Sequence, residues 1–205
     1  MSGTTAKYGL PYPTSTDLVK DGATAIEALA DDVDDLLGMN LVSDTTFTTV
    51  NTVNIDNCFS ATYRNYRIVF TLTAQSNSEL IYMRYRNSGG NNTTNQYDSG
   101  GMESQTGSAT LTAIGGMAQN KQRVMFSYNS PGFTTFTMDV MNPQVSTRTS
   151  HVSTAWSANS TTAVLTDELR GFFRGTDSFT GISFGLYDAG AQTMTGKVSV
   201  YGYAK

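Results

Sequence analysis

The sequence predicts a mainly β protein: an antiparallel β-sandwich of jelly-roll type, preceded by an extended arm and one short amphipathic helix. After residue 41, apolar residues alternate with polar ones, and clusters of Gly, Asn, Ser and Pro separate the alternating segments. Period-2 alternation is typical of half-buried antiparallel strands, and roughly eight to ten such segments fit a two-sheet sandwich. Helix signals are confined to the N-terminal part. We therefore expect two domains, an arm and helix in residues 1–40 and a sandwich in residues 41–205.

The composition favours a surface covered by uncharged polar side chains. Charged residues make up 15% of the 205 residues, whereas roughly 25% is typical of soluble proteins. This suits an extracellular or virion protein better than a cytosolic metabolic enzyme. The net charge of −4 is uneven, with −5 in residues 1–40 and +1 in residues 41–205. Because the β region has no basic face, we expect no nucleic-acid binding. No run approaches the ~18 apolar residues of a membrane span, so no membrane insertion is expected. The N-terminus also lacks the apolar segment of a secretory signal.

An extended arm is predicted at residues 8–13. Pro11 and Pro13 fix their own φ angles and bias the residues before them towards extended geometry. Tyr8, Leu10 and Tyr12 then share one side as an apolar edge. Such an edge either lies in a groove on a partner subunit or folds back onto its own domain. The predicted anchoring arm therefore consists of Tyr8, Leu10, Pro11, Tyr12 and Pro13.

An amphipathic helix is predicted to start near Thr24, where Glu27 gives the spacing of a capping box, and to stop at Gly38. Four apolar residues recur at helical spacing and form the predicted oligomer interface: Ile26, Leu29, Val33 and Leu36. This seam is either a short coiled coil or a helix lying on a sheet. It spans about two heptads, and a confident coiled-coil assignment needs about three or four.

The remaining elements are predicted strands with one apolar face. The residues expected to face the core are Tyr66, Ile68, Phe70 and Leu72; Val124, Phe126 and Tyr128; Phe136, Met138 and Val140; Ile182, Phe184 and Leu186; and Val198 and Val200. The stretch from Asn87 to Gly107 is long, polar and rich in Gly and Asn. It is predicted to be a mobile surface loop and a candidate contact region.

No motif indicates catalysis, so we expect neither enzymatic activity nor a bound metal or cofactor. His151 is the sole histidine, which excludes His-pair metal sites, and no nucleophile motif accompanies it. Cys58 is the sole cysteine, lies between apolar residues and is expected to be a buried thiol. Asp31, Asp32, Asp34 and Asp35 lack the glycine and distal glutamate of a calcium loop, and are interpreted as a solvated helix face.

Acidic residues scattered along the chain could in principle form the carboxylate pair of a glycosidase. A glycosidase needs two carboxylates at a defined separation, which a sequence does not show. The acids considered for such a pair are Glu79, Glu103, Asp139, Asp167 and Glu168. Nothing in the sequence distinguishes them from ordinary surface acids, and that is the interpretation we favour.

Two aromatic residues are candidate receptor contacts. An exposed Trp156, beside Asn and Ser residues, would make a platform on which a sugar ring stacks. The commoner alternative for a sole tryptophan is a place in the core, and the sequence favours it. Tyr97 lies in the polar stretch between Asn87 and Gly107 and is the second candidate.

The N-terminal motifs carry a family resemblance. Residues 8–13 read YGLPYP, Thr16 and Asp17 follow, and residues 21–30 read DGATAIEALA. This order resembles the N-terminal segment of tailed-bacteriophage minor tail and tail-fibre-like proteins. Residues 53–59 and 63–68 are similar to the opening of phage virion β-sandwich domains, and residues 198–203 to their closing strand. The resemblance implies a virion structural protein, often a homotrimer, with its N-terminal segment anchored to the particle.

We therefore expect a tail-associated virion protein of fibre or adhesion type. Residues 1–40 would bind other copies of the chain and neighbouring virion proteins, and the sandwich would contact a host-surface glycan or protein. A capsid decoration or head-fibre protein is the alternative, because the chain has no long shaft of repeats. A polysaccharide-degrading tailspike is a third alternative, against which the missing β-helix length and carboxylate signature count.

Overall fold

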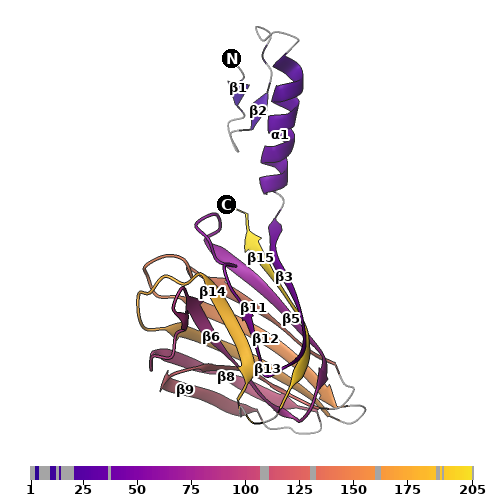
Figure 1. Cartoon of the computed structure of the whole chain (residues 1–205), viewed down its shortest axis with the longest axis vertical. Coiled ribbons are helices and arrows are strands. Elements are labelled where there is room, and N and C mark those ends of the chain that lie inside the picture. The colour runs from indigo at the N-terminus through magenta and orange to yellow at the C-terminus, as the bar shows by residue number, and fades with distance from the viewer. Residues whose placement is uncertain are drawn as a thin grey trace. The chain divides into compact units, whose positions relative to one another are not determined.

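The structure is a computed structural model that describes residues 3–4, 10–12, 14, 21–36, 38–106, 111–129, 133–159, 163–187, 190 and 192–204. The chain divides into two compact units, Met1–Asn40 with Ala204–Lys205, and Leu41–Tyr203. The first unit contains the arm and the helix, and the second contains the β-sandwich (Figure 1).

The first unit contains two short strands and one helix. β1 (Gly3–Thr4) pairs antiparallel with β2 (Pro11–Tyr12), and the Tyr12 ring lies against Gly3, where a Cβ would overlap it. α1 (Gly22–Leu36) contacts β2. Because α1 begins at Gly22, Thr24 lies within its first turn and does not cap it, so the predicted capping box is wrong. The helix ends before Gly38, as predicted, and the φ of 68° at Gly38 is a backbone conformation that glycine adopts without strain.

The second unit is an antiparallel β-sandwich of two sheets, which confirms the predicted fold class (Figure 1). The eight-stranded sheet has the order β3 (Met39–Val50), β15 (Met194–Tyr203), β5 (Asn65–Gln75), β11 (Thr134–Met141), β12 (Ser150–Asn159), β13 (Ala163–Phe173), β8 (Tyr97–Gln105) and β9 (Thr112–Gln119). The five-stranded sheet has the order β10 (Gln122–Ser127), β6 (Glu79–Asn87), β14 (Gly181–Leu186) and β4 (Thr52–Ile55), with β7 (Gly90–Asn91) paired to β6.

Aromatic and aliphatic side chains from both sheets fill the space between them. The Phe70 ring stacks on Phe136 of the same sheet at 4.7 Å between centroids and meets Phe184 of the other sheet at 5.4 Å. The predicted core residues of β5, β11, β14 and β15 are all buried: Tyr66, Ile68, Phe70, Leu72, Phe136, Met138, Val140, Ile182, Phe184, Leu186, Val198 and Val200. In these strands the period-2 pattern therefore identified the buried face correctly.

Strand β10 departs from the predicted alternation. Val124 is buried as predicted, but Met125 and Ser127 are buried as well, and Phe126 and Tyr128 are only partly buried. The pairing of β10 with β6 shifts register between Arg123 and Met125. Such a bulge inserts an extra residue and reverses which side chains face the core. The prediction that Phe126 and Tyr128 belong to the core is therefore wrong.

The predicted loop from Asn87 to Gly107 is largely strand. β7 and all of β8 lie within it, and Gly100 and Gly101 are inside β8. A Cβ on Gly101 would overlap the carbonyl oxygen of Glu168 in the neighbouring strand β13. Glycine in the middle of a strand allows this close approach of two backbones. Gly101 therefore marks close strand packing, and the interpretation of these glycines as a loop signal is wrong.

Candidate functional site

The predicted oligomer interface is an exposed apolar stripe on α1. Ile26 is 64% exposed and Val33 is 38% exposed in the single chain, while Leu29 is half-buried. The side chain of Leu36 lies outside the described residues. Asp31 and Asp32 are exposed, as expected of a solvated face. A helix of 15 residues is marginal in water unless its apolar side packs on something. The stripe is therefore a surface suited to a partner.

The predicted anchoring arm is described at Leu10, Pro11 and Tyr12, whereas Tyr8 and Pro13 lie outside the described residues. Pro11 and Tyr12 form β2, which pairs with β1 and contacts α1. The arm thus packs within its own unit. Tyr12 keeps an exposed ring surface despite its contact with Gly3, so part of the arm remains accessible to a partner.

The two candidate receptor contacts differ in exposure. Trp156 on β12 is 55% exposed, so its favoured assignment to the core is wrong. Tyr97 is fully buried, and its hydroxyl donates to the Asn92 carbonyl and accepts the Tyr85 N–H, both at 3.0 Å. Because the hydroxyl finds its partners inside the sandwich, the ring needs no solvent contact. The prediction of Tyr97 as a receptor contact is therefore wrong.

A cluster of cations and tyrosines lies on the outer face of the five-stranded sheet, the face turned away from the core. The Lys121 ammonium lies 3.6 Å from the centroid of the half-exposed Tyr187 ring and 4.6 Å from that of Tyr82. The Arg84 guanidinium lies 5.0 Å from the Tyr82 centroid. These are attractive cation–π contacts. The sequence offered no signal for this cluster, because its members come from separate segments.

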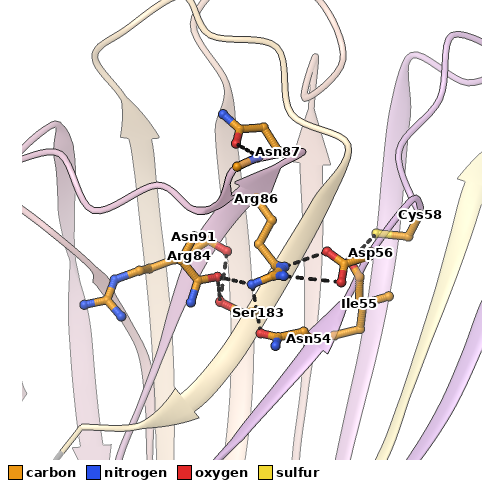
Figure 2. Close-up of polar contacts among 10 residues, drawn as sticks. Asn54, Ile55, Asp56, Cys58, Arg84, Arg86, Asn87, Asn91 and Ser183 are labelled. Carbon is orange, nitrogen blue, oxygen red and sulfur yellow. Dashed lines mark hydrogen bonds and ion pairs between the residues drawn. The ribbon is translucent and has the colours of Figure 1, made fainter.

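A second polar cluster on this sheet is centred on Arg86 (Figure 2). Its Nε and Nη2 donate to the two carboxylate oxygens of Asp56 at 2.7 and 3.3 Å. Its Nη1 donates to Oδ1 of Asn54 at 3.0 Å and to Oδ1 of Asn91 at 2.6 Å, and Ser183 also donates to Asn91. The Arg86 side chain is only 13% exposed. The cluster therefore holds β4, β6, β7 and β14 together and leaves little of the guanidinium for a ligand.

The sole histidine and cysteine are enclosed in the core. His151 is buried, its Nδ1 lies 3.2 Å from the Tyr85 hydroxyl, and burial lowers its pKa to about 4. Cys58 is buried, its thiol donates to the Ile55 carbonyl at 3.5 Å, and burial raises its pKa to about 12. A neutral enclosed imidazole and a protonated thiol are structural groups at neutral pH.

Two of the acids considered for a glycosidase pair come together. Glu103 of β8 and Asp167 of β13 are direct register partners, and both contact Nη2 of Arg123. Asp167 also accepts the Phe126 N–H at 2.9 Å, directly after the β10 bulge. Because one guanidinium joins both carboxylates, this is a charged link between the two sheets rather than an open acid–base pair.

The described residues show little else that would support catalysis, metal binding or a membrane span. Asp139, another of the acids, is held by Arg67 through two hydrogen bonds of 2.7 and 2.8 Å. Within the described ranges, no group of three or more His, Cys, Asp or Glu is placed to hold a metal ion. In the same part of the chain, no helix is long and apolar enough to cross a membrane.

The pH dependence of stability should reveal the buried state of Asp167. Burial raises the pKa of folded Asp167 to about 6 from an ordinary value of 3.8. Folded Asp167 therefore binds a proton more tightly than the unfolded chain does, so this group adds stability at low pH and loses it as pH rises towards 6. The free energy of unfolding of wild type minus that of Asp167→Asn should be larger near pH 4.5 than near pH 7.5, by on the order of 2 kcal/mol. Urea titrations at the two pH values measure it, and an equal difference at both would contradict the raised pKa.

No family model, curated protein or solved structure matches the chain. The resemblance to phage tail proteins therefore stays a prediction from the motifs of residues 8–37, 53–59, 63–68 and 198–203.

Proposed function

We propose that the chain is a structural protein of a tailed-bacteriophage virion, of tail-fibre or adhesion type, with residues 1–40 as the anchor and the β-sandwich as the displayed part. The observation that carries this proposal is the apolar stripe of α1. Ile26 and Val33 are exposed on a short helix that belongs to a compact unit of its own. Exposing such an apolar stripe to water is unfavourable in a free monomer. Burying it in an assembly stabilises the helix.

The anchoring unit has two surfaces for assembly. The stripe of Ile26, Leu29, Val33 and Leu36 would pack against the same stripe of other copies, and a homotrimer is the arrangement that the family resemblance implies. The arm, with Tyr12 partly exposed, would bind a neighbouring virion protein. Tail attachment is the preferred location.

The sandwich would act by binding rather than by catalysis. His151 and Cys58 are enclosed, and Glu103 and Asp167 are joined by Arg123. The outer face of the five-stranded sheet instead offers the half-exposed Tyr187 beside Lys121. An aromatic ring flanked by hydrogen-bonding groups suits a host-surface glycan or a polar protein surface.

Deletion of residues 1–13 tests the anchoring role. The truncated chain should be absent from purified virions while remaining abundant in the infected lysate, as judged by immunoblotting. Its sandwich should unfold at the same urea concentration as that of wild type, because the deleted residues belong to the other unit. Incorporation at the wild-type level would contradict the proposal. Cross-linking of wild-type virions distinguishes the locations, since capsid neighbours in place of tail neighbours would favour a decoration or head-fibre protein.

A further inference from the structure

The outer face of the eight-stranded sheet is divided into two halves of different chemistry. On β3, β15, β5 and β11, charged groups satisfy one another. Asp139 binds Arg67 and the Tyr203 hydroxyl, and Asp44 binds Lys197 at 2.8 Å and the Ser199 hydroxyl at 2.7 Å. This polar half is a solvated surface that needs no partner.

The other half, on β12, β13, β8 and β9, carries exposed large apolar side chains among its polar ones. Its outward-facing large apolar residues are Met102, Met117, Val152, Trp156, Val164 and Phe172. They come from four adjacent strands of one sheet. Contiguous exposed apolar surface is uncommon on monomeric proteins and marks interaction sites. We call this surface the apolar half.

The apolar half contains an indentation. A pocket of about 570 Å³ lies over Gly100, with Phe172, Val152, Arg170 and Met117 among its lining residues. A Cβ at Gly100 would meet no atom within 4 Å. The missing side chain thus leaves room into which an apolar group from a partner fits.

Two opposite charges lie within the apolar half. Glu168 and Arg170 are two residues apart on β13, and both side chains are exposed. Among the described residues, neither side chain has a hydrogen-bonding or ion-pair partner. Their cross-strand neighbours on β8 differ, since Arg170 lies beside Gly100 and Glu168 lies beside Met102. Met102 itself is 49% exposed.

We propose that the apolar half is a self-association surface, on which a second copy of this chain packs face to face with its strands antiparallel. A two-fold axis running across the strands near Leu169 places Glu168 of each copy opposite Arg170 of the other. By the register of β8 with β13, the same operation places Met102 of each copy over the indentation at Gly100 of the other. In a two-fold contact every interaction occurs twice, so charge and shape are both self-complementary.

This contact is separate from the seam on α1, and it does not depend on the proposed virion role. In this arrangement Trp156 belongs to the contact between copies, because it lies on β12 within the same apolar half. The half-exposed Tyr187, in its cation–π contact with Lys121 on the other sheet, then remains accessible for host binding.

Sedimentation of the full chain tests the contact. Ile26→Asp is used as the background, so that the helix seam does not contribute. This chain should dimerise with increasing concentration. Adding Gly100→Glu should weaken dimerisation at least tenfold, because the new side chain fills the indentation. Because a Cβ at Gly100 meets open space, this variant should keep the fold, and circular dichroism checks that it does. Thr73→Glu, an exposed site on the polar half, is the matched control and should dimerise as the background does.

Exchanging the charges of Glu168 and Arg170 in the same background tests whether the partner is a second copy of the chain. Glu168→Arg and Arg170→Glu should each weaken dimerisation about tenfold, because each creates like-charge pairs at both ends of the contact. The double variant should recover the background affinity, since it exchanges both partners of both pairs. Failure of the double variant to recover would overturn the proposed register. A background chain that stays monomeric at all concentrations would overturn self-association itself.

Discussion

Ile26→Asp should break up the proposed helix-mediated trimer and leave the β-sandwich folded. Among the seam side chains that the structure describes, Ile26 is the most exposed, at 64% in the single chain. In the assembly it would pack at the centre of a helix–helix contact. Placing an unpaired carboxylate there is expected to cost several kcal/mol, on the order of 3. A contact of about two heptads has too little apolar area to offset that loss.

Multi-angle light scattering measures the result. The mass should fall from that of the wild-type assembly to that of one or two chains, while the urea unfolding midpoint of the sandwich stays unchanged. The matched control is Ala28→Asp, which adds the same charge to α1 at an exposed position outside the seam. It should retain the wild-type mass. If Ile26→Asp also retained it, the stripe would not be the oligomer interface.

The buried faces of most strands were predictable because they depend on local alternation alone. Phe136, Met138 and Val140 face the core whichever strands lie beside them. The side of the strand on which the Phe126 side chain lies could not be predicted from local alternation. It follows from a bulge in the pairing of β10 with β6, which is a property of two segments that lie far apart in sequence. Glycine was ambiguous for a similar reason, since Gly101 serves close strand packing in a stretch whose composition indicates a loop.

The candidate surfaces depended even more on register. The sequence identified the apolar stripe of α1, because residues three and four apart on a helix share a face. It did not show that Glu103 and Asp167 are cross-strand partners, or that Gly100 lies beside Arg170. Trp156 and Tyr97 show the same limit. Each sits in a polar stretch, yet one faces solvent and the other is enclosed among Tyr85, Phe173 and Asn92.

The second large effect is on the stability of the sandwich. It concerns the two adjacent glycines of β8, where each substitution is the control for the other. Gly101→Ala should destabilise the sandwich by about 3 kcal/mol or more, because its Cβ would overlap the Glu168 carbonyl and crowd the Leu169 Cα. The overlap is relieved only if β8 and β13 move apart. That movement would also strain the ion pairs of Glu103 and Asp167 with Arg123. Backbone atoms, unlike the end of a flexible side chain, have no alternative rotamer to adopt.

Gly100→Ala should instead be neutral or stabilising by roughly 0.5 kcal/mol, because its Cβ meets open space and alanine restricts the unfolded chain. Urea unfolding of the two variants at one pH measures the difference. Similar losses in both would mean that β8 and β13 are not in the described register, and that Gly100 is not at the floor of the indentation. A large loss confined to Gly101→Ala would support the register that places Met102 beside Glu168 and Gly100 beside Arg170, on which the self-complementarity of the apolar half depends.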